Sequence, residues 1–171
     1  MPTLSLSRTP AEAVEHYRSR TVRLLSCITN AHVVVSGYHA ATVPHRLSLA
    51  DSDPVRLRGE QQLTLDVAEH YRVRNTDDGW WVQVVAYSYI LGQDGHELIV
   101  YHWHPSGRSS ITSPHLHVRT DIQIGERWLG KVHLPTGPIR LEDIVALAVG
   151  DLGAQPLRED WEKLIHEARD R

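Results

Sequence analysis

The chain has 171 residues, of which 41% are hydrophobic and 23% are charged, and its formal net charge is -3 with neutral histidines. This composition is typical of one globular domain and excludes both a disordered chain and a strongly basic nucleic-acid binder. With one cysteine, Cys27, and no run of ~18 apolar residues, the chain is expected to be cytoplasmic, without an internal disulfide or membrane contact.

A helix is expected over residues 10–26. Thr9 is a suitable N-cap, Pro10 suits the first helical position, and Glu12 completes a capping box. Apolar residues then recur along one helical face, as in a helix that packs on a core.

Residues 31–134 are rich in β-branched and aromatic residues and predict an antiparallel sheet of about five to six strands. Within this region, residues 44–54 are predicted to be turn. The stretch LTLDVAEHYRVR alternates apolar and polar residues, which indicates a strand with one buried and one solvated face. The Asp94-Gly95 dipeptide predicts a hairpin turn between WWVQVVAYSYIL and HELIVYHWH.

The C-terminal region, residues 139–170, returns to helical periodicity and predicts a pair of helices. Gly153 is expected to end the first of them, and Pro156 precedes the second. Strands grouped between helices indicate an α+β fold, and no linker divides the chain, so a single domain over residues 1–171 is expected.

Histidines concentrate in VYHWHPSGRSSITSPHLHV, residues 100–118, as two His-x-His pairs flanking a polar loop. Alternate residues of a strand share a face, so each pair should project to one side of the sheet. If the loop joins neighbouring antiparallel strands, His104 should lie near His115 and His102 near His117. The core-facing side chains, expected to be more buried than the histidines, are then Tyr101, Trp103, Leu116 and Val118.

One interpretation of this cluster is acid–base chemistry on an RNA phosphodiester, because imidazole titrates near neutral pH. The predicted catalytic residues are His102, His104, His115 and His117. The predicted substrate-binding residues are Arg108, Arg119 and Lys131 for phosphate, and Trp80 for stacking on a base. This interpretation needs no metal or other cofactor.

Two alternatives use the same residues differently. His102, His104, His115 and His117 could ligate a divalent transition metal such as zinc, although neither pair contains a carboxylate to offset the charge. Otherwise the histidines are polar groups on a solvated sheet face. The chain would then be a non-catalytic module that binds a protein partner through its aromatic sheet and C-terminal helices.

Several short motifs within residues 79–118 resemble the central block of the TumE family of toxins from bacterial toxin–antitoxin modules. The matching residues are Tyr87-Ser88-Tyr89, Asp94-Gly95, Leu98-Ile99, Tyr101, and Pro114-His115 with His117. The stretch RLEDIV also resembles the helix that closes the family's chain. The family's Asp-Asn pair is absent, and His102 and His104 stand in its place. The resemblance implies a partner antitoxin protein and a nucleic-acid-related target. Together with the histidine cluster, it leads us to expect a toxin-like enzyme that acts on RNA, a ribonuclease-type hydrolase or transesterase.

Overall fold

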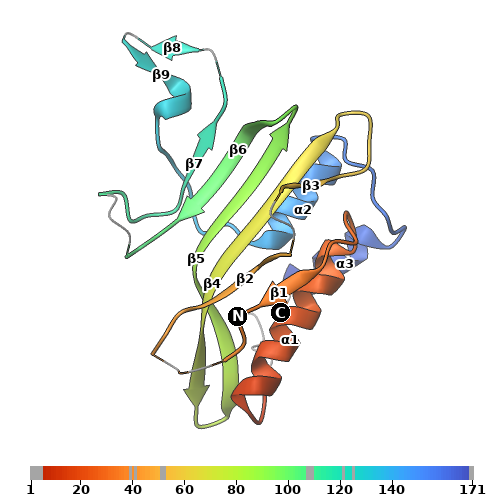
Figure 1. The fold of residues 1–171 in the computed structure, drawn as a ribbon, viewed down its shortest axis with the longest axis vertical. Coiled ribbons are helices and arrows are strands. Elements are labelled where there is room, and N and C mark those ends of the chain that lie inside the picture. Colours follow the sequence, from red (N-terminus) through yellow and green to blue (C-terminus); the bar gives the residue numbers. More distant parts are fainter. Residues whose placement is uncertain are drawn as a thin grey trace.

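The expected α+β arrangement, with one N-terminal helix, an antiparallel sheet and two C-terminal helices, is confirmed (Figure 1). The structure is a computed structural model. It describes residues 6–38, 40, 42–50, 53–106, 110–120, 122–124 and 126–169.

Helix α1 spans Pro10–Leu25 and begins as its sequence predicts. The Thr9 hydroxyl accepts a hydrogen bond from the backbone N–H of Glu12 at 3.1 Å, and Pro10 occupies the first turn. Its apolar face buries Val14, Leu24 and Leu25 against the sheet. Cys27 follows the helix and is fully buried, so its thiol is a core group.

The main sheet contains eight antiparallel strands within the described residues, in the order β1-β2-β4-β5-β6-β7-β10, with β3 paired to β4. Its strands are β1 (Val33–Val35), β2 (His45–Leu49), β3 (Val55–Arg56), β4 (Leu63–Thr76), β5 (Gly79–Gln93), β6 (His96–Trp103), β7 (His115–Val118) and β10 (Leu134–Pro135). The expected five to six strands are exceeded by two- and three-residue strands at or near the edges. Between β7 and β10, an arm holds β8 (Gln123–Ile124), β9 (Arg127–Trp128) and the 3₁₀ helix η1 (Leu129–Lys131).

The prediction that residues 44–54 form turn was wrong for β2. This strand alternates, with His45, Leu47 and Leu49 buried, and it pairs with β4. The polar residues that suggested a turn lie on the solvent-facing side of β2 or in the segment after it.

The Asp94-Gly95 hairpin is confirmed. Gln93 pairs with His96, and both intervening residues have positive φ, 52° for Asp94 and 76° for Gly95. Two positive φ angles suit a two-residue hairpin turn whose twist matches that of the strands. This turn sets β6 beside β5.

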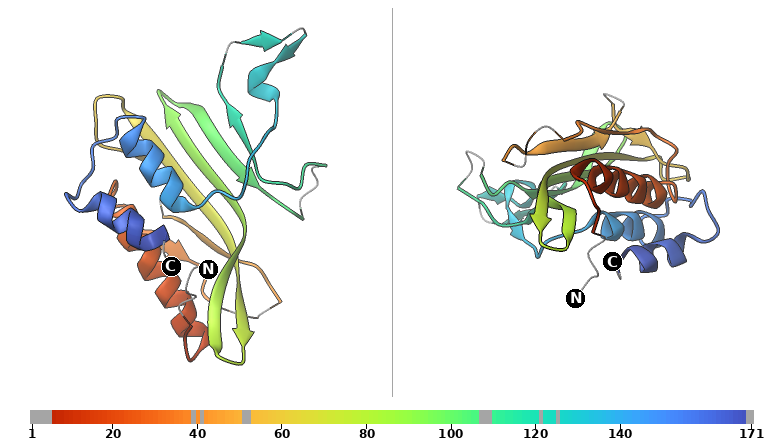
Figure 2. Two further views of the ribbon diagram at one scale, coloured as in Figure 1. Left: turned by 180° about the vertical axis from the view of Figure 1, so that it is seen from behind. Right: turned by 90° about the horizontal axis from the view of Figure 1, so that it is seen from below.

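The helices cover one face of the sheet, and the core lies between (Figure 2). The alternation predicted for β4 is confirmed, since Leu63, Leu65, Val67, Tyr71 and Val73 are buried, together with Glu69, and the residues that alternate with them are partly exposed. Helices α2 (Leu141–Gly150) and α3 (Trp161–Arg169) complete this layer. Gly153, with φ of 77°, lies just beyond α2, as expected. None of the described helices is long and apolar enough to cross a membrane.

Candidate functional site

The two His-x-His pairs lie on neighbouring strands of the sheet, on the face away from the helices. In the observed register His102 faces His115, and His117 faces Val100. The predicted pairing of His104 with His115 was therefore wrong by two residues. Strand β6 ends at Trp103, so the backbone of His104 has already left the ladder, and the loop between the strands is not symmetric about the histidines.

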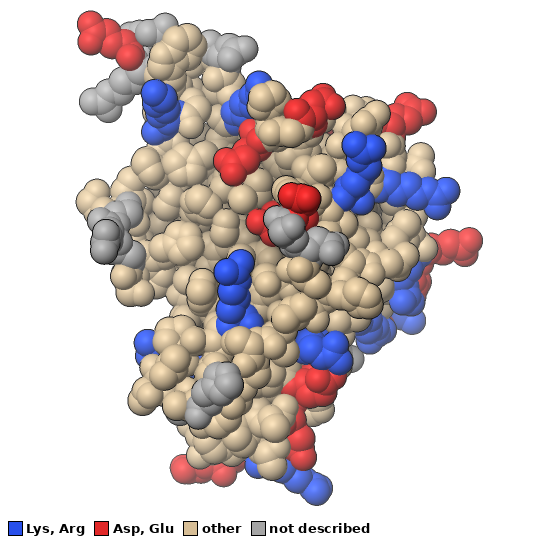
Figure 3. All heavy atoms as spheres, in the orientation of Figure 1, with Lys and Arg blue, Asp and Glu red and all other residues tan. Residues whose placement is uncertain are grey.

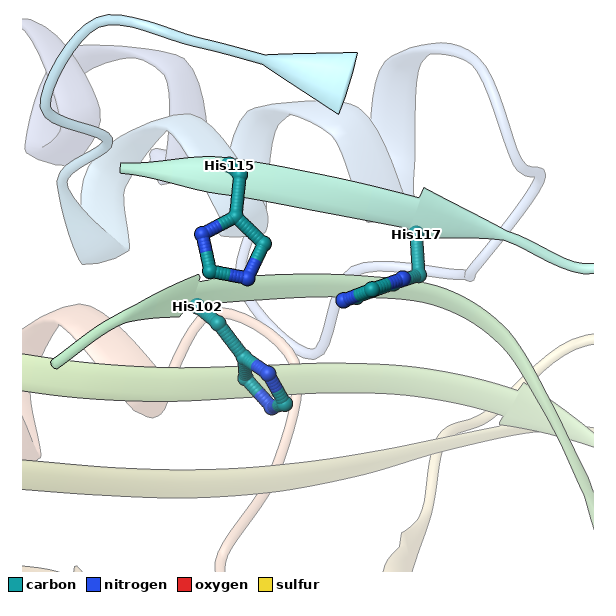
Figure 4. A group of neighbouring side chains, drawn as sticks. All are labelled: His102, His115 and His117. Atoms are coloured by element: carbon teal, nitrogen blue, oxygen red, sulfur yellow. The ribbon is translucent and has the colours of Figure 1, made fainter. Parts of the chain in front are cut away.

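Three of these side chains point toward one another (Figure 4). One ring nitrogen from each of His102, His115 and His117 lies within 4.8 Å of the other two. The ring centroids are 5.9 Å apart for His102 and His115, 5.8 Å for His102 and His117, and 5.2 Å for His115 and His117. Three imidazoles from two strands therefore converge on one point.

His115 is the most enclosed member of the group, with 6% of its surface exposed. Its Nδ1 lies 2.9 Å from the backbone oxygen of Ser113. Because a carbonyl oxygen only accepts hydrogen bonds, Nδ1 carries a proton, which leaves Nε2 as the nitrogen available to a metal ion. A backbone carbonyl holding the second nitrogen in this way is typical of histidines that ligate metals.

The expectation that Tyr101, Trp103, Leu116 and Val118 are all more buried than the histidines was wrong for His115. The four are only partly buried, although Tyr101 and Trp103 do pack toward the core as predicted. The reason is that β10 pairs with the outer edge of β7, which encloses His115 on a side that the sequence pattern leaves open.

The environment of two members of the cluster, His102 and His117, favours their neutral imidazoles. Burial, followed by the neighbouring histidines, lowers the pKa of His102 from 6.5 to about 4. Burial and the rings of His133 and His115 also lower the pKa of His117, while Glu97 acts in the opposite direction. Unprotonated rings at neutral pH keep the lone pairs that a metal ion requires.

Two further histidines flank the three. The ring of His133, on the segment entering β10, lies 4.5 Å from His117 and 5.0 Å from His115 between centroids. His104 lies 5.3 Å from His102 on the other side. His133 was not among the predicted site residues, and only the pairing of β10 with β7 brings it there.

Of the predicted phosphate-binding residues, Arg119 and Lys131 lie beside the cluster. Arg119 lines a hollow of about 240 Å³ together with Glu97 and His117. Lys131 lines another, of about 500 Å³, that includes His133. Figure 3 shows acidic and basic side chains near the upper part of this face, with a broader surface of other residues below them.

Trp80, predicted to stack on a base, lies away from this site. Arg108 lies outside the described residues. Trp80 stands eight residues along β5 from Ser88, the partner of His102, which is roughly 26 Å at 3.3 Å per residue. Its ring is partly buried against the core and lies 6.3 Å from Tyr38, so it is a packing residue.

The arrangement offers nitrogen ligands for a borderline metal ion, or paired imidazoles for proton transfer. Glu97 supplies the nearby carboxylate that the His-x-His pairs themselves lack. Comparison of the chain with protein-family models, with curated proteins and with solved structures finds no match in any of the three.

Proposed function

We propose that the protein binds one divalent transition metal ion, with zinc as the best fit, through His102, His115 and His117. The observation that carries the proposal is the convergence of three ring nitrogens within 4.8 Å. Zinc–nitrogen bonds of 2.0–2.1 Å place tetrahedral ligands about 3.4 Å apart, so modest side-chain rotations would bring the rings into range.

Three histidine ligands leave one position of a tetrahedral ion for water or substrate, which is the arrangement of catalytic zinc sites. A metal ion held by these three histidines would lower the pKa of its bound water and would supply a nucleophile for hydrolysis. The open hollow lined by Glu97, His117 and Arg119 adjoins one of the three ligands and is the space proposed for an anionic substrate. The proposed chemistry is therefore metal-assisted hydrolysis, with Arg119 contacting a phosphate or carboxylate.

Metal content of protein prepared without a histidine tag tests the proposal. After exposure to zinc and dialysis, wild type should retain about one ion per chain, and His102→Ala, His115→Ala and His117→Ala should each retain much less. His96→Ala is the matched control, because His96 is an exposed histidine at the start of the same strand. The proposal is contradicted if wild type retains no zinc, or if the three variants retain as much zinc as wild type.

RNA cleavage by a TumE-like toxin stays a prediction, and one feature of the site favours retaining it as a second candidate. His102 and His115 are opposite each other on neighbouring strands, with ring centroids 5.9 Å apart, and would serve as the acid–base pair. Single-stranded RNA should be incubated with wild type, with chelator-treated wild type and with His102→Ala. Cleavage lost in the variant but retained after chelation would favour metal-free acid–base catalysis, whereas loss in both would favour the metal.

A further inference from the structure

A second polar site lies on the opposite face of the sheet, beneath the helices. A cavity of about 230 Å³ is enclosed by α1, β4, β5, β6 and the start of α2. Its walls include Leu24, Val84, Tyr87, Trp103, Ile139 and Leu141. The side chains of Arg20 and Arg140, which also line it, keep 41% and 40% of their surface exposed, so the cavity reaches solvent beside them.

Two buried carboxyl groups line this cavity, Glu69 and Glu142, and each residue is only 4% exposed. The hydroxyl of Tyr17 donates to Oε2 of Glu69, and that of Tyr89 donates to Oε1 of the same residue. A carboxylate has about four lone-pair positions, so two remain for a ligand. The two tyrosines fix the carboxylate without neutralising it.

The arginines at the rim are directed elsewhere. Arg20 and Arg140 both pair with Glu142, and both donate to the backbone oxygen of Ala168 at 2.9 Å. In the described part of the chain, Glu69 has no ion pair with a lysine or arginine. A buried carboxylate without a counter-charge is costly, and it either takes up a proton or attracts a cation.

Aromatic rings surround the carboxylate. Tyr87 and Tyr89 stack with centroids 4.8 Å apart, and Trp103 lies 5.9 Å from Tyr87. Aromatic faces attract organic ammonium groups and also give an apolar surface to the remainder of such a ligand. The combination of a fixed carboxylate and aromatic walls distinguishes this cavity from an ordinary gap in the core.

We propose that this cavity binds a small primary amine as its ammonium ion, with Glu69 as the counter-charge and the aromatic walls holding an apolar body. The site shares no residue with the histidine cluster and does not depend on the metal proposal. An organic acid of the same size is disfavoured, because its carboxylate would face Glu69.

Phenethylamine and 2-phenylethanol are suitable probes, because they share an aromatic body and differ in charge. Isothermal titration and amide chemical shifts would measure their binding at pH 7.5. Wild type should prefer the amine by at least about tenfold, and Glu69→Gln should abolish that preference. Glu162→Gln also removes one acidic group, but from an exposed position of α3 outside the cavity lining, so it should leave the preference for the amine unchanged.

The wild-type comparison tests the proposal even if Glu69→Gln does not fold. Equal affinity for the amine and the alcohol would overturn it. So would the absence of any amide shift at the cavity residues at about 10 mM amine, a concentration that detects even weak binding. An unchanged preference for the amine in folded Glu69→Gln would also overturn it, because the cation would then bind elsewhere.

Discussion

At the scale of the residue, His115 and Glu69 are buried polar side chains that lie on opposite faces of the sheet. Both are buried, with 6% and 4% of their surface exposed. His115 is held by a backbone carbonyl, and Glu69 is held by two tyrosine hydroxyls. Glu69 lies on the buried face of β4, at alternate positions with the apolar residues Val67 and Tyr71. A glutamate at such a position is the sequence signal that predicts a buried acidic group.

The titration of Glu69 gives a prediction about pH. Burial raises its pKa above the ordinary 4.5, and this effect outweighs the hydrogen bonds from Tyr17 and Tyr89 and the charge of Arg20, which act in the opposite direction. The folded chain therefore holds this proton more tightly than the unfolded chain. The associated stability is complete below pH 4.5 and is lost as the pH rises through the folded pKa. Glutamine carries no such loss.

Glu69→Gln should therefore gain stability relative to wild type as the pH rises from 4.5 to 8, whatever its offset at pH 4.5. Urea unfolding at several pH values in this interval measures the trend. Glu162→Gln, which removes an exposed acidic group from α3, should show no comparable trend. A stability difference between Glu69→Gln and wild type that stays constant with pH would argue against a raised pKa.

At the scale of the element, local signals predicted the helices, the long strands and the Asp94-Gly95 turn, because each depends on periodicity or on a single dipeptide. The short strand β2 was missed because its polar positions resemble turn residues. The register of β7 on β6 was also missed, because a long loop, unlike a two-residue turn, does not fix the pairing. His133 joins the site only through β10, a contact with no local signal.

The bulge in the β5–β6 pair gives a prediction for this scale. Register shifts between Leu91 and Gly92, and a Cβ at Gly92 would lie 2.6 Å from the Thr64 hydroxyl oxygen and 2.8 Å from the backbone oxygen of His96. Gly92→Ala should cost about 1–3 kcal/mol of unfolding free energy, because backbone cannot move aside easily. Denaturant unfolding measures the loss.

Gly137→Ala is the control for that substitution, because a Cβ at Gly137 would meet no atom within 4 Å. It should change stability by less than about 0.5 kcal/mol. If both alanine variants are equally stable, the close packing at the bulge does not constrain the pairing of β5 with β6.

At the scale of the whole molecule, Glu142 and two arginines link the N-terminal helix α1 to the C-terminal helices α2 and α3. Glu142, at the start of α2, has a side chain only 6% exposed and pairs with Arg20 of α1 and with Arg140. The same two arginines donate to the Ala168 carbonyl near the end of α3. Three helices that are distant in sequence are thereby joined on the core face, beside the Glu69 cavity.

Replacing Glu142 with glutamine should loosen this junction. The variant keeps the size of the side chain but removes the charge that both guanidinium groups share, so two cations would lie together without their counter-charge. Because the arginines are about 40% exposed, solvent reduces the penalty, and the free energy of unfolding should fall by about 1–3 kcal/mol.

Hydrogen exchange should show the largest loss of protection in α3, which is short and depends on these contacts for its C-terminal carbonyls. The exposed Glu162→Gln variant in α3 is the control and should retain wild-type protection. If α3 exchanges in Glu142→Gln at the same rates as in wild type, then apolar packing alone, through Leu164 and Ile165, holds this helix on the core.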